Sequence, residues 1–242
     1  MVANQKNHIL EDGWVKRVTL TPPELSDNTS DADRLVEGLK KELKSDGVAI
    51  DLQLLKKLPF LLREWDYQAG CVVLKDRQGW QVVGIFSSQQ PGSPLGLAVD
   101  LGTSRVVIRL VSLLSGDVLG EQSFDNPQIS IGPDILARVH FSEEAKGLDT
   151  LNRLIVEGLN QNIDSVCRSC GTDPDNIYLI SLAGNTTMTH LFMGLDPRWI
   201  IREPYIPVIN RPGMMRASDL GVAINPSGRI YIHPNIGSSF GG

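Results

Sequence analysis

Four small or polar residues, Asp100, Gly102, Thr103 and Ser104, stand out because they form a turn between two apolar segments. A glycine lets such a turn bring its backbone N–H groups close to phosphate oxygens, and the two hydroxyls add further donors. Asp100 ends the first apolar segment, where a carboxylate can hold a water molecule of hydrated Mg²⁺. The pattern predicts a phosphate-binding hairpin with Asp100 as its catalytic and metal-binding residue. An ordinary tight turn is the alternative, since short glycine-rich patterns are common.

A second polar turn, made of Gly184, Asn185, Thr186 and Thr187, lies between an expected strand and an expected helix. Exposed N–H groups at the start of a helix, together with hydroxyls, can receive a phosphate. The four residues are therefore predicted to line the same nucleotide cleft. Asn and Thr are also common helix N-caps, so a purely structural cap is the alternative.

Apolar patterning indicates the strands and helices that hold these two turns. Three strands form an antiparallel meander, and helices then alternate with a further strand. This order is typical of a mixed sheet with helices on its faces, the topology of a ribonuclease-H-like half-domain. Beyond Pro197 frequent prolines interrupt the pattern, and only 229–233 resembles a strand. In chain order the strands are expected at 95–101, 105–114, 117–124 and 176–182, and the helices around Ile135, Leu136 and Val139, at 148–170 and at 188–193.

The residues before this meander indicate a small α+β domain of their own. A polar, proline-containing segment ends it, so we expect a tail at 1–13, the small domain at 14–88, a linker at 89–94 and the mixed-sheet domain at 95–242. The expected elements of the small domain are a strand at 14–20, a helix from the capping pattern of Ser30 and Asp33 to Gly47, a helix capped by Asp51 and broken near Pro59, and paired strands at 71–74 and 81–86.

Composition and charge narrow the classes of partner. The net charge of −5 comes from interspersed acids and bases, which argues against nucleic acid and against anionic membrane surfaces. Residues 1–12 resemble no signal or transit peptide, and no segment reaches the roughly 20 apolar residues of a membrane span. Three cysteines are too few for a disulfide framework and favour a reducing cytoplasm. Cys167 and Cys170 offer only two of the four ligands of a structural zinc, so both are expected to pack in or near the core.

A few other charged residues have interpretations that remain open. Asp134 and Arg138 lie one helical turn apart and are expected to form an exposed ion pair, with a role near the phosphates or at a partner surface as the alternative. Arg105 either contacts phosphate or faces solvent. Three histidines are isolated in the sequence and are assigned no role: His140, His190 and His233.

Taken in order, the hairpin, the Asn126-Pro127-Gln128 entry to a helix and the run from Gly184 to Met188 resemble the ATP-dependent reductive activators of corrinoid proteins. These activators belong to the actin-like superfamily of acetate and sugar kinases and chaperone ATPases. The resemblance covers most of the chain, with 95–242 similar to the first part of the ATPase domain and 14–88 to the small domain that precedes it. It implies ATP and Mg²⁺ as cofactors, a corrinoid protein as partner, and reduction of Co(II) corrinoid to Co(I).

Two further expectations follow from the resemblance. The family's iron–sulfur cluster needs four thiolates, and the three scattered cysteines of this chain do not supply them. The chain also ends before a second hairpin of the Asp-x-Gly-Thr kind and before an adenosine site, so the nucleotide site is expected to be incomplete and complete ATP turnover is not expected. We therefore expect a fragment of an activator.

Two other functions stay open at this stage. One is a non-catalytic interaction module, in which 14–88 mediates docking or dimerisation and 95–242 is a scaffold. The other is a small-molecule kinase of the same superfamily. Apolar surface left by a missing second lobe predicts association in solution, so a homodimer is an expected partner.

Overall fold

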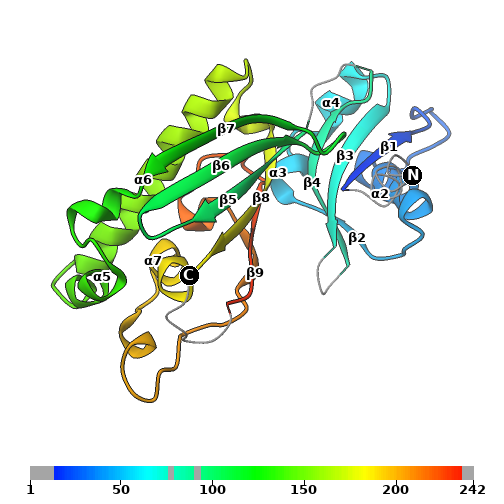
Figure 1. Cartoon of the computed structure of the whole chain (residues 1–242). Helices are drawn as coiled ribbons and strands as arrows, with labels where there is room; N and C mark the ends of the chain where they lie inside the picture. The colour runs from blue at the N-terminus through cyan, green and yellow to red at the C-terminus, as the bar shows by residue number, and fades with distance from the viewer. Residues whose placement is uncertain (1–13, 76–78, 90–93, 236–242) are drawn as a thin grey trace, which may run out of the picture.

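The computed structural model describes residues 14–75, 79–89 and 94–235, and these form two units (Figure 1). Each unit is built on its own sheet. The first has four strands in the order β1-β3-β4-β2, and the second has six in the order β7-β6-β5-β8-β10-β9. The expected tail at 1–13 and most of the expected linker at 89–94 lie outside the described residues.

The small unit has the helices and paired strands expected from its sequence, with two additions. The additions are β2, a strand of three residues, and α4, whose first turn contains Pro59. The helix capped by Asp51 ends at Leu55, so the expected break near Pro59 is confirmed. Pro59 itself lies in the first turn of α4, where proline is tolerated. The helix α2 ends at Leu43 instead of Gly47, because Lys44 adopts a left-handed conformation with φ 49°. The elements are β1 (Val15–Thr19), α2 (Asp31–Leu43), β2 (Val48–Ile50), α3 (Leu52–Leu55), α4 (Leu58–Glu64), β3 (Gln68–Lys75) and β4 (Trp80–Ser87).

The large unit confirms the predicted mixed sheet. The meander β5-β6-β7 is antiparallel, whereas β8 pairs with β5 and β10 pairs with β8 in parallel. One strand of this sheet was not predicted from the sequence: β9, an antiparallel edge strand of four residues beside β10. The elements are β5 (Leu95–Leu101), β6 (Arg105–Ser112), β7 (Val118–Asp125), α5 (Ile135–Ser142), α6 (Gly147–Ser169), β8 (Ile177–Gly184), α7 (Thr186–Met193), β9 (Gly213–Arg216) and β10 (Arg229–Ile232).

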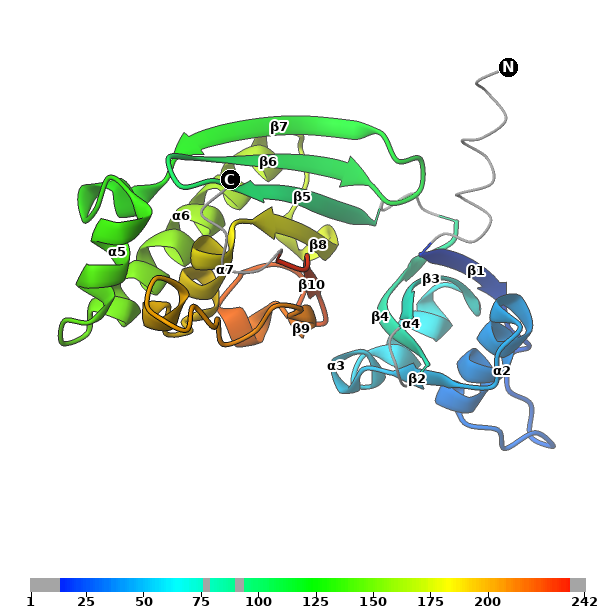
Figure 2. The same cartoon turned by 60° about the horizontal axis from the view of Figure 1, so that its bottom comes forward.

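One face of the six-stranded sheet carries the core of the large unit. Alternate residues of β5 point to this face, and they are Leu97, Val99 and Leu101. They pack in one buried cluster with residues of α6 and α7, helices that Figure 2 shows on the same side of the strands. The sheet and these two helices therefore share a single apolar layer.

The opposite face of the sheet is open near the ends of β5 and β8. Ala98, Asp100 and Ala183 are exposed there. Helices were expected on the faces of the sheet, and in the described ranges α6 and α7 both join the core on the other face. None of the helices in these ranges is both long and apolar enough to cross a bilayer.

The two cysteines of α6 and its C-terminus pack as expected. Cys167 is fully buried in the core of the large unit, and Cys170 packs against that core at its edge. Burial raises the pKa of the Cys167 thiol to about 11. Both residues therefore act as small apolar side chains, as free cysteines commonly do.

The small unit packs against the six-stranded sheet at the end opposite to the turn between β5 and β6. Phe86 of β4 lies in a buried cluster with Tyr178 and Leu179 of β8, and a Cβ on Gly84 would lie 2.3 Å from the Tyr178 ring. A cavity of about 410 Å³ remains at this contact and is lined by residues of both units, among them Trp65 and Tyr178.

An ionic cluster joins the two units beside this apolar contact. The carboxylate of Asp51 accepts hydrogen bonds from the N–H of Gln53, at 2.9 Å, and from Nη2 of Arg229, at 2.9 Å. Nη2 of Arg216 lies 3.0 Å from the same carboxylate. Asp51 thus caps α3 of the small unit and pairs with β9 and β10 of the large unit.

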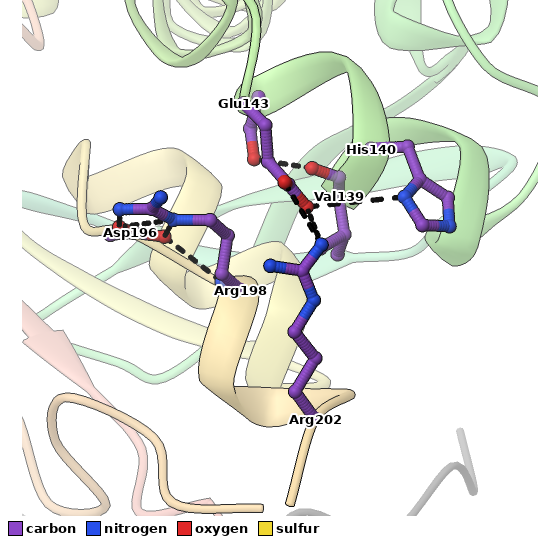
Figure 3. Close-up of polar contacts among 7 residues, drawn as sticks. Val139, His140, Glu143, Asp196, Arg198 and Arg202 are labelled. Atoms are coloured by element: carbon purple, nitrogen blue, oxygen red, sulfur yellow. Dashed lines mark hydrogen bonds and ion pairs between the residues drawn. The ribbon is translucent and has the colours of Figure 1, made fainter.

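Ion pairs hold the stretch after α7 in place (Figure 3). Arg202 donates through Nη2 to both carboxylate oxygens of Glu143, at 2.7 and 2.9 Å, and Arg198 pairs with Asp196. Residues 198–208, named the 198–208 segment below, expose four large apolar side chains: Trp199, Tyr205, Ile206 and Val208.

The buried side chain of His190 holds the end of this segment by a hydrogen bond. Its ring is fully buried, Nδ1 lies 2.7 Å from the carbonyl oxygen of Thr186, and Nε2 accepts a hydrogen bond from the N–H of Val208 at 3.1 Å. Accepting at Nε2 requires the neutral ring, with its proton on Nδ1. Burial lowers the pKa of His190, against the opposing effect of the Thr186 carbonyl.

Acidification is expected to weaken the fold through His190. The ordinary histidine pKa is about 6.5, and below this pH the histidine of the unfolded chain binds a proton. The pKa of His190 is lower in the folded chain, so the folded chain binds this proton less readily. Stability that is present above a pH of about 6.5 is therefore lost as the pH falls. Urea unfolding at pH 7.5 and pH 5.5 measures the loss. It should be smaller in His190→Gln, whose amide oxygen can still accept from Val208, than in the wild type. The exposed His140→Gln is the control, and equal losses in wild type and His190→Gln would contradict the prediction.

Candidate functional site

The predicted hairpin is present as the turn between β5 and β6. Leu101 pairs with Val106, and Gly102, Thr103 and Ser104 form the connection. A Cβ on Gly102 would lie 2.3 Å from the carbonyl oxygen of Arg105. The turn therefore requires glycine because of its own backbone, before any ligand is considered.

Asp100 lies on the open face of the sheet, one residue before the end of β5. Its neighbours across the strands are Val107 and Ala183. Its side chain is exposed, and it makes no hydrogen bond or ion pair with another described residue. A carboxylate in this position is accessible to a hydrated cation.

Three consecutive carbonyl groups of the turn are tied down by hydrogen bonds. Asn126 donates from Nδ2 to the oxygen of Gly102 and from its backbone N–H to the oxygen of Ser104, each at 2.9 Å. Arg138 donates from Nη2 to the oxygen of Thr103 at 2.7 Å. In a trans peptide the C=O and the following N–H point in opposite directions. The N–H groups of Thr103 and Ser104 consequently point away from Asn126 and Arg138.

The second predicted turn meets the hairpin through Asn185. Its Oδ1 caps α7 by accepting from the N–H of Met188 at 2.9 Å, and its Nδ2 donates to Oγ1 of Thr103 at 3.1 Å. The capping alternative is thus confirmed for Asn185, and the same side chain joins the two turns. Gly184 is half-buried, whereas the side chains of Thr186 and Thr187 are buried.

Arg138 does not form the exposed pair with Asp134 that was expected. Asp134 caps α5, its Oδ1 accepting from the N–H of Ala137 at 2.8 Å, while Arg138 is fully buried. Besides Thr103, its guanidinium donates to the oxygen of Gly132, at 2.8 Å, and to Oε1 of Gln128, at 3.2 Å. Burial lowers the pKa of Arg138 to about 10.

Asn126 and Gln128 stand out in the sequence, but their structural roles were not predicted from it. Both side chains are buried, and Gln128 donates from Nε2 to the oxygen of Leu151 on α6 at 2.9 Å. Arg105 is exposed and lies 3.2 Å from Asp125, which favours the solvent-facing interpretation. The signal for the buried network was the polar Asn126-Pro127-Gln128 motif directly after β7.

The three cysteines are not arranged as ligands of an iron–sulfur cluster. Cys71 lies in β3 of the small unit, whereas Cys167 and Cys170 lie in or after α6. Burial raises the pKa of Cys71 to about 12, which disfavours the thiolate that a cluster requires. In the part of the chain that the structure describes, no group of three or more His, Cys, Asp or Glu side chains could hold a metal ion.

Comparisons with known proteins all find similarity to corrinoid activators, and together they cover most of the chain. Residues 14–91 match a family model described as the RACo linker region, and residues 95–242 match one described as the RACo middle region. A curated relative, the corrinoid activation enzyme RamQ of Eubacterium limosum, is 30% identical over 165 residues, which are 67% of this chain and 28% of the relative. A solved structure of a reductive activator for corrinoid, iron–sulfur protein is 32% identical with a TM-score of 0.83, and the match covers 96% of this chain and 37% of that one.

Proposed function

Because this chain belongs to the RACo family, whose middle-region model matches residues 95–242, we propose that it is part of an ATP-dependent activator that reduces corrinoid proteins from Co(II) to Co(I). The chain spans 28% of the curated relative and 37% of the solved one. The activity of the whole activator therefore belongs to a longer protein. The part that we propose for this chain is to hold the phosphates of ATP.

The observation that carries this proposal is the anchored hairpin. The hydrogen bonds of Asn126 and Arg138 to its carbonyl oxygens turn the N–H groups of Thr103 and Ser104 outward. Successive N–H groups that point to one side form an anion-binding concavity. The open face of the sheet leaves room beside them for a ligand.

The residues of this site fit a polyphosphate with hydrated Mg²⁺. Asp100 would hold a water molecule of the cation, and the hairpin N–H groups with the hydroxyls of Thr103 and Ser104 would hold phosphate oxygens. When bound, Mg²⁺ neutralises part of the phosphate charge. We propose that Gly184, Asn185, Thr186 and Thr187 act mainly by positioning, since Asn185 holds Thr103 and the two threonines are buried.

The remaining assignments concern partners and location. We propose a corrinoid protein as the partner, in keeping with the names of both relatives. An iron–sulfur cluster would be carried by another part of the activator, because the cysteines of this chain do not fit one. A homodimer and a cytoplasmic location stay predictions from the sequence.

Calorimetric titration of Mg-ATP and of a non-hydrolysable analogue into this chain tests the proposal. The wild type should bind, and Asp100→Asn should bind at least tenfold more weakly. Asp117→Asn, which changes an exposed acid in the neighbouring hairpin, is the matched control and should bind like the wild type. Equal binding by wild type and Asp100→Asn, or no binding by the wild type, would contradict the proposal.

A further inference from the structure

Arg138 carries a buried positive charge that forms no ion pair with another described residue. Its guanidinium donates to two backbone oxygens, to Oε1 of Gln128 and to Sδ of Met188, all of them neutral acceptors. The acid closest to it in the sequence, Asp134, uses a carboxylate oxygen to cap α5, and its charge acts on Arg138 without a hydrogen bond, opposing in part the effect of burial on the pKa of Arg138. The charge is therefore well hydrogen-bonded and only partly compensated.

Such an arrangement costs stability unless something offsets the charge. Removing a cation from water is expensive, and buried arginines are ordinarily paired with carboxylates. Burial lowers the pKa of Arg138, yet at about 10 the group stays protonated at neutral pH. The neighbouring hairpin is the place where a negative ligand would supply the remaining compensating charge.

A single peptide group connects Arg138 with the outer side of the hairpin. Arg138 donates to the Thr103 oxygen at 2.7 Å, and the N–H of Ser104 lies on the other side of the same peptide. A cation on the oxygen polarises the peptide and makes its N–H a stronger donor to an anion. The surrounding protein screens this effect less than water would.

We propose that Arg138 is a positioning residue that supplies, from beneath the hairpin, the positive charge offsetting the phosphates held on its outer side. This inference rests on the proposed function and deepens it, because it assigns the site a preference for ligands of high negative charge. Arg138 does not touch the ligand. Its effect should therefore grow with the number of phosphates, independently of the nucleoside.

The test compares Arg138→Met, which removes the charge, with Arg138→Lys, which keeps it. Affinities for Mg-ATP, Mg-ADP and AMP are measured by calorimetry. Arg138→Met should weaken Mg-ATP at least tenfold, Mg-ADP less, and AMP least, while Arg138→Lys should keep the wild-type order. Arg153→Met, which removes an exposed charge from α6, is the control. Equal losses for all ligands, or no loss, would overturn the inference.

A second readout separates this inference from the proposed function. Inorganic tripolyphosphate should raise the Tm of the wild type and of Arg138→Lys, but not of Arg138→Met. If the wild type binds no nucleotide and this pattern holds, the proposed function fails and the inference stands. Equal shifts in wild type and Arg138→Met overturn the inference alone, and the absence of any response in the wild type overturns both. If Arg138→Met does not fold, Arg138→Lys alone decides. A preference for ligands with more phosphates that persists in Arg138→Lys supports the inference, and loss of this preference overturns it.

Discussion

Replacing Asp51 with asparagine is expected to lower the free energy of unfolding by about 3 kcal/mol, because it breaks a buried ion pair and leaves an arginine unpaired. The side chain of Asp51 is 1% exposed and that of Arg229 is 12% exposed. Asparagine keeps the volume and the ability to cap α3, so the change isolates the charge. Urea unfolding, followed by tryptophan fluorescence, measures the effect.

Two arginine variants serve as controls for this prediction. Arg216 is 45% exposed, so Arg216→Met should cost less than about 1 kcal/mol, whereas Arg229→Met should approach the cost of Asp51→Asn. A change of less than about 0.5 kcal/mol in Asp51→Asn would show the prediction to be wrong.

The Asp51 effect should also depend on pH. Burial by itself would raise the pKa of Asp51, but hydrogen bonds from Arg229 and Gln53 and the nearby arginine charges outweigh burial and lower it. A lowered carboxyl pKa adds stability above the unfolded value, about 3.9, and this stability disappears as the pH falls through the folded value. The difference between wild type and Asp51→Asn should therefore shrink in acid.

Replacing Gly102 with alanine should damage both the hairpin and its ligand binding. The added Cβ would meet the Arg105 oxygen at 2.3 Å, so the backbone of the turn must shift. We expect a loss of about 2 kcal/mol in the free energy of unfolding, in the range of other overpacked sites. Because the shift displaces the N–H groups of Thr103 and Ser104, calorimetry should find Mg-ATP binding at least tenfold weaker.

The next hairpin of the same sheet provides the matched control. Gly116 has φ +75° and nothing within 4 Å of an added Cβ. Gly116→Ala should cost about 1 kcal/mol through backbone strain and leave nucleotide binding unchanged. Unimpaired Mg-ATP binding in Gly102→Ala would contradict the role given to this turn.

The sequence predicted well those elements whose apolar pattern is long and regular. The strands β5 and β6 are long apolar runs in which fully buried residues alternate with more exposed ones from Leu97 onward, and α6 carries an apolar face over 23 residues. The short elements β2, β9 and α4 were missed because three to seven residues show too little period to be recognised. These elements depend on the neighbours against which they pack.

Within the candidate site, the sequence located the turns but not their support. The short helix α5 reverses the usual rule, since Leu136 is 47% exposed while Arg138 is fully buried. An isolated helix would favour the opposite arrangement. Burial of the arginine becomes favourable because α5 packs beside the hairpin. There Arg138 donates to the carbonyl oxygens of Thr103 and Gly132, which need hydrogen-bond donors.

The contacts that hold the 198–208 segment have a consequence for the entropy of association. Its exposed side chains, which include Trp199 and Ile206, project from a backbone already fixed through Arg202 and Val208. Ordering a mobile loop would cost about 1 to 2 kcal/mol per residue. When another protein covers this segment, the complex forms without much of this ordering cost. More of the free energy gained by burying its apolar side chains therefore remains as binding affinity.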